Sequence, residues 1–223
     1  VHQRIRVDQL DDMPCMDNDV LRRGKPTVHV QFGEALALLA GDALQALAFE
    51  LLTPSHSGIA DAVQVQLCRI LARAAGHEGM AGGQAIDLAS VGQSLNETQL
   101  RQMHALKTGA LLEASVRMGA SCGTGLPADT LAALQRYGQA IGLAFQVVDD
   151  ILDVTADSQT LGKTAGKDEA NDKPTYVSLM GLSAARAHAR HLHEQAMQAL
   201  AGCGLTQTQA LAALADRVVN RHA

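Results

Sequence analysis

The run ADTLAALQRYGQAIGLAFQVVDDILDV, which follows Pro127, constrains the fold more than any other part of the sequence. It is rich in strong helix formers, and proline is well tolerated in the first turn of a helix. The run therefore predicts one long helix that ends near Asp153, where the polar segment 155–172 begins.

Other segments show the same helical character, and the sequence contains no convincing strand pattern. The segment 33–52 is apolar nearly all round, which predicts a central helix. Aromatic residues make up 2% of the chain, so strand-favouring side chains are scarce. We expect an all-α, single-domain helical bundle, with further helices at 59–75, 80–90, 96–106, 107–120, 183–201 and 206–219.

Composition excludes several classes of function. The formal charge is -5, which gives no basic face for nucleic acid or anionic lipid. The four cysteines form no C-x-x-C pair, and no uninterrupted apolar run approaches the roughly 20 residues of a membrane span. We therefore expect a cytoplasmic protein with no nucleic-acid partner and no membrane span.

Three aspartates stand at the end of the long predicted helix. Asp149 and Asp153 are one helical turn apart, so their carboxylates lie on one face and can share a cation. Asp150 is adjacent. Apolar residues surround the three acids, and carboxylates beside apolar surface repel one another unless a cation compensates. A solvated helix end is the alternative interpretation.

A second acidic cluster lies near the start of the chain, at Asp11, Asp12 and Asp17. Because Pro14 ends or kinks any helix that carries the first two, a loop must bring Asp17 back towards them. Oxygen ligands suit Mg²⁺, and the guanidinium groups of Arg22 and Arg23 suit phosphate oxygens. A charged surface loop with internal ion pairs is the alternative for this cluster alone.

Other motifs fail on inspection. Gly162, Lys163 and Thr164 resemble the end of a Walker A loop, but the upstream glycine position holds Asp157 and no strand precedes it. The histidines at 188–193 lack the H-E-x-x-H pattern, so a solvated helix face explains them better. Cys15 has no histidine placed by sequence to activate it.

Five blocks together resemble the trans-isoprenyl diphosphate synthase family, and within it the bacterial farnesyl diphosphate synthases. The resemblance runs from Asp11 almost to the end of the chain. The first block includes the first aspartate-rich motif, in the form with two additional residues before the third Asp. The blocks are DDMPCMDNDVLRRGKPTVHVQFGEALALLAGDALQALAFELL, GMAGGQAIDLAS, LKTGALLEAS, FQVVDDILD and LGKTAGKDEANDKPTYVSLMGL.

This resemblance implies an isoprenoid-synthase bundle around a central cavity, with roles for individual residues. It implies that magnesium, as three ions, is held on one wall by Asp11, Asp12 and Asp17 and on the other by Asp149 and Asp153. It also implies that Gln84 and Asp87 line the cavity and that Lys167 lies in a closing loop. The residues implied to contact the substrates are Arg22, Arg23, Lys107, Thr108, Gln146, Lys163 and Lys173.

The resemblance implies that isopentenyl diphosphate is condensed with dimethylallyl or geranyl diphosphate, and that diphosphate is released. Neutralisation of the leaving diphosphate drives ionisation, and no nucleophilic side chain is required. The resemblance implies five catalytic residues, which are three aspartates of the two motifs and two lysines: Asp11, Asp12, Asp149, Lys107 and Lys163. We expect farnesyl diphosphate as the product, with geranylgeranyl diphosphate as the main alternative, and a homodimer by resemblance alone.

The chain departs from the family pattern before Asp11. Family members carry several helices before the first aspartate motif, whereas Val1 to Leu10 resembles the amino-terminal helix of the family. We therefore expect that a segment is missing between residues 10 and 11. A non-catalytic prenyl-synthase-like subunit, a terpene cyclase and a purely structural bundle remain as alternatives.

Overall fold

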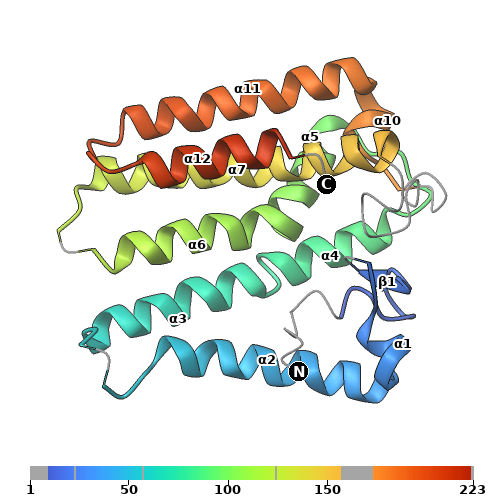
Figure 1. Ribbon diagram of the computed structural model, residues 1–223, viewed down its shortest axis with the longest axis horizontal. Helices are drawn as coiled ribbons and strands as arrows, with labels where there is room; N and C mark the ends of the chain where they lie inside the picture. The colour runs from blue at the N-terminus through green and yellow to red at the C-terminus, as the bar shows by residue number, and fades with distance from the viewer. Residues whose placement is uncertain (1–9, 23, 57, 124, 157–172, 222–223) are drawn as a thin grey trace. The chain divides into compact units, whose positions relative to one another are not determined.

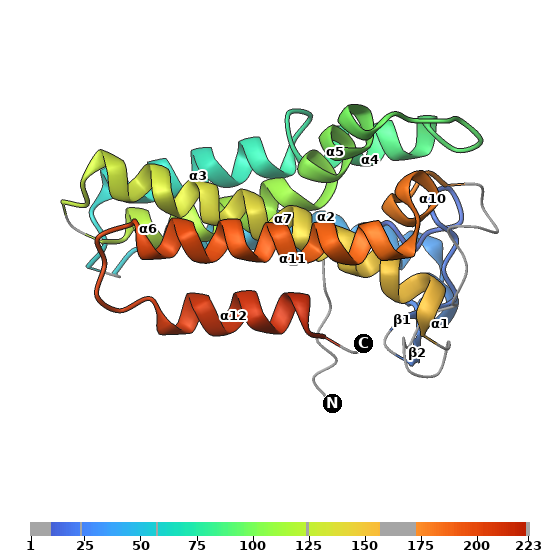
Figure 2. The same ribbon diagram turned by 90° about the horizontal axis from the view of Figure 1, so that it is seen from above.

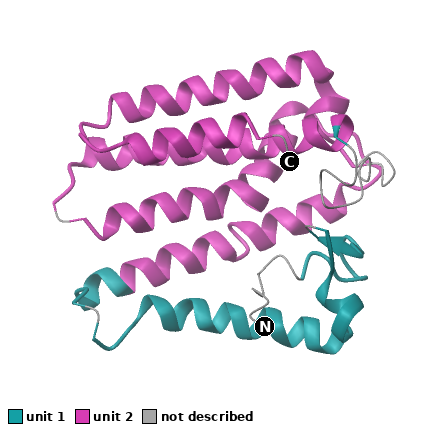
Figure 3. Cartoon of the chain, viewed as in Figure 1, with its two compact units in different colours: residues 1–64, 156–165, 223 teal, residues 65–155, 166–222 magenta. Residues whose placement is uncertain are grey.

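The computed structural model describes residues 10–221, except for residues 23, 57, 124 and 157–172 (Figure 1). The chain divides into two compact units (Figure 3). Unit 1 takes in residues 1–64, 156–165 and 223, and unit 2 takes in residues 65–155 and 166–222. Lys163, Lys167 and Arg23 lie outside the described residues, so their predicted roles stay predictions, as does the single domain over 1–223.

Unit 1 begins with a series of turns over residues 10–17 and a small antiparallel hairpin. The hairpin pairs β1 (Leu21–Arg22) with β2 (Lys25–Pro26), and Gly24 takes the positive φ that its turn needs. Two helices follow, α1 (Val28–Phe32) and α2 (Glu34–Leu52). The Leu10 side chain packs on α2 at Gly41, where an added Cβ would stand only 2.7 Å from it.

Helix α2 does not take the buried position predicted for it. Only Ala37 and Gly41 of this helix are buried, and its large exposed side chains include Leu36, Leu39 and Leu51. Among the described helices, α2 alone is long and apolar enough to cross a membrane, with a mean hydropathy of 1.6. Core helices of soluble proteins meet the same two criteria. The exposed leucines of α2 thus form an apolar surface of the kind that packing against another part of a protein buries.

Unit 2 is a bundle of antiparallel helices (Figures 1 and 2). Helix α7 is in its middle, in contact with α6, α11 and α12. Most of α3 also belongs to this unit. The elements of unit 2 are α3 (Asp61–Ala75), α4 (Met80–Ala89), α5 (Glu97–His104), the π-helix η2 (Ala105–Gly109), α6 (Ala110–Ser121), α7 (Ala128–Thr155), α10 (Tyr176–Met180), α11 (Leu182–Ala201) and α12 (Gln209–Val219).

Three apolar clusters form the core of the described part of unit 2, and α7 contributes to the two larger ones. One cluster packs Val147 and Ile151 of α7 against Leu192 of α11, and the other packs Leu134 and Ile141 of α7 against α11 and α12. Small residues let the helices approach closely, because a Cβ at Gly142 would stand 2.8 Å from the Cα of Gly109. Burial of this helix on several sides positions its acidic carboxyl end.

The all-α class and the main helices agree with the prediction from sequence, while short elements were missed. Helix α5 starts at a capping box, in which the Asn96 side chain accepts a hydrogen bond from the backbone amide of Gln99 and the Gln99 side chain accepts one from the backbone amide of Asn96. The boundary expected between the helices at 96–106 and 107–120 is instead a π-helix over 105–109. Sequence patterns did not predict the two-residue strands, α1 or α10, because elements this short show no complete period.

Candidate active site

The first acidic cluster forms a tight loop in unit 1. The backbone amide of Asp17 donates to the carbonyl oxygen of Asp11 (2.9 Å), and the amide of Asp19 donates to that of Asp12 (3.1 Å). The turn needs a left-handed residue, and Asn18 supplies it with φ 49°. Asp17 therefore returns to Asp11 through a loop, the geometry that Pro14 predicted.

Within this cluster Asp12 is buried and paired. The residue is 3% exposed. Its Oδ1 accepts one hydrogen bond from Nε of Arg22 (3.0 Å) and another from Nη2 of Arg22. A guanidinium that holds a carboxylate in this way is kept near the cluster. The structure thus joins Arg22 to the first acidic cluster.

The second acidic cluster lies at the end of α7, and its members have different surroundings. The side chain of Asp149 is 31% exposed, whereas Asp150 and Asp153 are 2% and 3% exposed as residues. Both Asp150 oxygens accept hydrogen bonds, Oδ1 from Nε2 of Gln146 (3.1 Å) and Oδ2 from the backbone amide of Tyr176 (2.8 Å). Asp150 therefore connects α7 to α10.

Arg221, which sequence analysis missed, contacts the more exposed Asp149. Its Nη2 donates to Asp149 Oδ1 (3.2 Å) and to the carbonyl oxygen of Phe145 (2.9 Å), and the guanidinium carbon lies 4.0 Å from the centre of the Phe145 ring. Burial lowers the pKa of Arg221 and Asp149 opposes that shift, so the group stays cationic. No sequence spacing connects Arg221 to Asp149, because they lie on separate elements.

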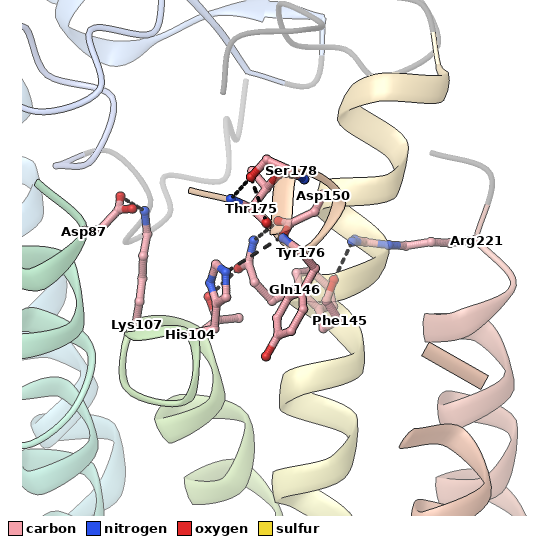
Figure 4. A network of polar contacts seen from close by, with 11 residues as sticks. Asp87, His104, Lys107, Phe145, Gln146, Asp150, Thr175, Tyr176, Ser178 and Arg221 are labelled. Carbon is pink, nitrogen blue, oxygen red and sulfur yellow. Dashed lines mark hydrogen bonds and ion pairs between the residues drawn. The ribbon is translucent and has the colours of Figure 1, made fainter. Parts of the chain in front are cut away.

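Two lysines meet on one carboxylate in unit 2. Lys107 Nζ lies 2.7 Å from Oδ2 of Asp87, the pair that Figure 4 shows. Lys173 Nζ lies 3.2 Å from the same oxygen, and Asp87 is 4% exposed. Burial alone would raise the pKa of Asp87, but the two ammonium groups outweigh it and hold the pKa below its usual value. The two ammonium groups are thus fixed on one buried carboxylate.

The π-helix presents Lys107 and Thr108 side by side. Thr108 Oγ1 donates to Oε1 of Gln146 on α7 (3.0 Å). Gly83 of α4 makes this arrangement possible, because a Cβ there would stand 2.1 Å from the backbone nitrogen of Lys107. The π-helix adds one residue to the turn, and such segments are frequent at functional sites.

Aromatic rings pack behind this polar group. The rings of His104 and Tyr176 are stacked with centroids 5.7 Å apart, and the Tyr176 and His188 rings lie 5.3 Å apart. Burial lowers the pKa of His104 to about 4, so its ring is neutral at pH 7 although Nε2 lies 3.8 Å from Asp150 Oδ2. His188, which was predicted to lie on a solvated helix face, is half-buried against Tyr176.

Gln84 of α4 has a buried side-chain amide. The residue is 7% exposed, and within the described part of the chain neither its Nε2 nor its Oε1 has a hydrogen-bond partner. Because buried amides are normally satisfied, this one indicates a group that a ligand or ordered water completes.

The donor set of the two acidic clusters fits magnesium. Its members are carboxylate oxygens, and among residues 10–221 outside the gaps no three acidic, histidine or cysteine side chains gather into a closed metal site. Magnesium is usually held by one or two carboxylates together with water and substrate phosphates, so an incomplete protein shell is suited to it. Asp11, Asp12 and Asp17 in unit 1, and Asp149 and Asp153 in unit 2, are the candidate ligands.

Comparison with known proteins gives the same family from sequence and from structure. The polyprenyl synthetase family model matches residues 9–212. A protein of Bradyrhizobium diazoefficiens named "Probable farnesyl diphosphate synthase" is 53% identical over 93% of this chain and 62% of its own length. The farnesyl diphosphate synthase of Escherichia coli is 47% identical over 95% of this chain and 72% of its own length.

A solved structure is also similar over most of the chain. The geranyltransferase of Helicobacter pylori, in complex with magnesium and isoprenyl diphosphate, superposes with a TM-score of 0.83 at 37% identity, covering 95% of this chain and 68% of that one. The chain thus spans roughly two thirds of the length of the proteins that it resembles.

Proposed function

The chain belongs to the polyprenyl synthetase family, and on that premise we propose that the protein to which it belongs is a magnesium-dependent prenyltransferase. Its substrates are isopentenyl diphosphate and an allylic diphosphate, dimethylallyl or geranyl, and its product is farnesyl diphosphate. The observation that carries the proposal is the pair of ammonium groups of Lys107 and Lys173 on Asp87, beside Thr108 and Gln146 and in the same unit as the aspartates of α7.

Ionisation of the allylic substrate breaks the bond between its C1 carbon and the diphosphate oxygen, which places negative charge on the leaving group. Lys107 and Lys173 bind and orient that leaving group, because Asp87 has already fixed their positions. Arg22, together with Arg23 and Lys163 from outside the described residues, contributes further positive charge. The mechanism needs no covalent bond to the protein.

Magnesium would be held by Asp11, Asp12 and Asp17 and by Asp149 and Asp153, as three ions. Bound there, it supplies positive charge that neutralises the diphosphate as it leaves. The two aspartate groups belong to different units, and their convergence on one substrate is part of the proposal.

Coupling forms a bond between the allylic C1 and the terminal alkene carbon of isopentenyl diphosphate, and a proton then leaves the new cation for the released diphosphate. Thr108 and Gln146 stand beside the developing cation in this proposal. Apolar side chains around the α7 aspartates, including Val147 and Ile151, exclude water that would otherwise capture the cation.

A homodimer and a cytoplasmic location are proposed with this function. The exposed leucines of α2 are supporting observations, because they form an apolar surface of the kind that protein contacts bury: Leu36, Leu38, Leu39, Leu47 and Leu51. The mass of the purified protein in solution, measured by light scattering, tests the dimer directly.

The function is tested by supplying isopentenyl diphosphate and geranyl diphosphate with Mg²⁺ and identifying the product by chromatography. We expect a fifteen-carbon diphosphate. A twenty-carbon diphosphate would replace the proposed product with geranylgeranyl diphosphate, and a hydrocarbon formed from geranyl diphosphate alone would indicate a terpene cyclase. A folded protein that makes no product would indicate a non-catalytic subunit.

A further inference from the structure

A directed series of hydrogen bonds crosses unit 2 from the π-helix to α10. Thr108 Oγ1 donates to Gln146 Oε1 (3.0 Å). Gln146 Nε2 donates to Asp150 Oδ1 (3.1 Å), and the Tyr176 backbone amide donates to Asp150 Oδ2 (2.8 Å) (Figure 4). We name this series the Thr108–Asp150 relay. It joins three elements that are far apart in sequence: η2, α7 and α10.

The carboxylate at its end gives the relay its direction. An ionised carboxylate only accepts hydrogen bonds, so the amide nitrogen of Gln146 must face Asp150 and its oxygen must face Thr108. Thr108 must then donate its only hydroxyl hydrogen to Gln146. A neighbouring group therefore meets the lone pairs of the Thr108 oxygen rather than its hydrogen.

The acceptor position of Asp150 is itself fixed by its surroundings. Tyr176 is 0% exposed, and its ring is held between His104 and His188. Its backbone N–H is a donor that cannot reverse, unlike a hydroxyl or a side-chain amide. One Asp150 oxygen thus accepts a hydrogen bond from α10, and the other accepts one from Gln146 and orients it.

We propose that Asp150 is a positioning residue for prenyl transfer, which sets the direction of the Thr108–Asp150 relay so that the Thr108 oxygen offers lone pairs to the developing allylic cation. The inference rests on the proposed function and deepens it. It assigns the middle aspartate of the second motif a task different from that of Asp149 and Asp153, which are the candidate magnesium ligands. Asp150 is suited to this task because it is nearly fully buried and bonded within the protein on both oxygens.

Replacement of Asp150 by asparagine tests the direction, because the shape of the side chain is kept. The fixed Tyr176 amide requires the Asn oxygen on its side, so the Asn NH₂ group faces Gln146. Gln146 must then turn its oxygen towards residue 150 and its nitrogen towards Thr108. The Thr108 hydroxyl becomes an acceptor, and its hydrogen points towards the substrate, where it repels positive charge.

We expect Asp150→Asn to lower kcat roughly 10- to 100-fold, the scale for loss of a residue that orients another functional group. The KM for each substrate and the Mg²⁺ concentration for half-maximal rate should stay within about twofold. Asp149→Asn is the matched control, and it should raise that Mg²⁺ concentration at least about tenfold. Equal increases in the Mg²⁺ requirement for the two variants would overturn the proposal and make Asp150 a metal ligand.

A rescue variant separates direction from general damage. In Gln146→Glu combined with Asp150→Asn, the carboxylate moves one step along the relay, accepts from the Asn NH₂ group and again accepts from Thr108. We expect kcat to rise at least about fivefold above that of Asp150→Asn alone, while Gln146→Glu alone places two carboxylates together and should be the least active. A double variant no better than Asp150→Asn would contradict the directional argument.

Nuclear magnetic resonance keeps this inference apart from the proposed function. The Tyr176 amide should stay protected from hydrogen exchange in Asp150→Asn and lose protection in Asp150→Ala. The Gln146 NH₂ resonances should shift in Asp150→Asn as the amide reverses, in the presence or absence of catalysis. If the parent is active but the Gln146 resonances do not shift in Asp150→Asn, the relay is refuted. If the parent is inactive but these resonances do shift in Asp150→Asn, only the prenyl-transfer assignment is refuted.

Discussion

Gly83 lies directly against Lys107: a methyl group on Gly83 would stand 2.1 Å from the Lys107 backbone nitrogen and 2.5 Å from its Cα. Backbone atoms cannot move aside as a flexible side chain can. The π-helix that carries Lys107 and Thr108 therefore depends on the absence of a side chain on α4.

We predict that Gly83→Ala displaces the π-helix, lowering kcat/KM at least about tenfold and the free energy of unfolding by about 1–3 kcal/mol. Gly119→Ala is the matched control on α6, where an added Cβ meets nothing within 4 Å. That control should retain activity and gain up to about 1 kcal/mol, because alanine is the better helix former. Steady-state kinetics and urea unfolding check both variants, and equal behaviour of the two would refute the packing argument.

Lys107 is predicted to contribute charge at the site rather than stability. Lys107→Gln should lower kcat/KM about 10²- to 10³-fold, as expected for removal of one group that stabilises a leaving anion. Arg186 is exposed on α11, and Arg186→Gln is the control. We expect its kinetics to be unchanged. Rates measured at several salt concentrations are informative here, and retained activity in Lys107→Gln would remove this residue from the mechanism.

Arg221 is predicted to compete with magnesium for Asp149. The two side chains are 21% and 31% exposed, and they meet at 3.2 Å. Mn²⁺ is a paramagnetic substitute for Mg²⁺. Removal of this ion pair by Arg221→Gln should lower the dissociation constant for Mn²⁺ by up to about fivefold. Electron paramagnetic resonance titration measures the free ion. Weaker binding in the variant would mean that Arg221 supports the metal site instead.

Buried His104 should make folding stability depend on pH. Its pKa of about 4 in the folded protein lies below the ordinary value of 6.5, because burial disfavours the charged ring. Between these values the unfolded chain binds the proton more tightly, so this contribution is complete above pH 6.5 and is lost as the pH falls towards 4. The full effect is about 3 kcal/mol.

The His104 contribution is isolated with His104→Phe, which keeps a ring to stack on Tyr176. Urea unfolding between pH 4 and 7 should show a flatter dependence on pH in this variant than in the parent. His77→Gln, at a histidine whose side chain is 94% exposed, serves as the control. Identical slopes in parent and His104→Phe would contradict a neutral buried ring.

The helices of unit 2 could be predicted from sequence because their apolar periodicity and terminal signals are local. Asn96 shows why, since its capping box lies within four neighbouring residues. The partners of the acidic residues are not local in this sense. Asp149 contacts Arg221, and Asp87 contacts Lys173, although the partners are far apart in sequence. These contacts depend on tertiary packing, so no local pattern predicts them. The position of Tyr176 against Asp150 likewise depends on α10, which is too short to show a pattern.

The predicted burial of α2 fails for a related reason. Apolar residues on nearly every side indicate that a helix is covered, but they do not identify what covers it. Five leucines of α2 are exposed in this chain, which spans 62% of the Bradyrhizobium relative and 72% of the Escherichia coli one. Burial in a longer chain or a dimer would satisfy the same pattern.

The central claim is magnesium-dependent prenyl transfer by the two aspartate clusters, and one measurement tests it most directly. The purified protein is supplied with isopentenyl and geranyl diphosphates, and farnesyl diphosphate is measured with and without Mg²⁺ for the parent, Asp11→Ala and Asp149→Ala. The account predicts product only with Mg²⁺ and a loss of at least about 10²-fold in each variant. Product formed without Mg²⁺, or undiminished in either variant, would contradict it.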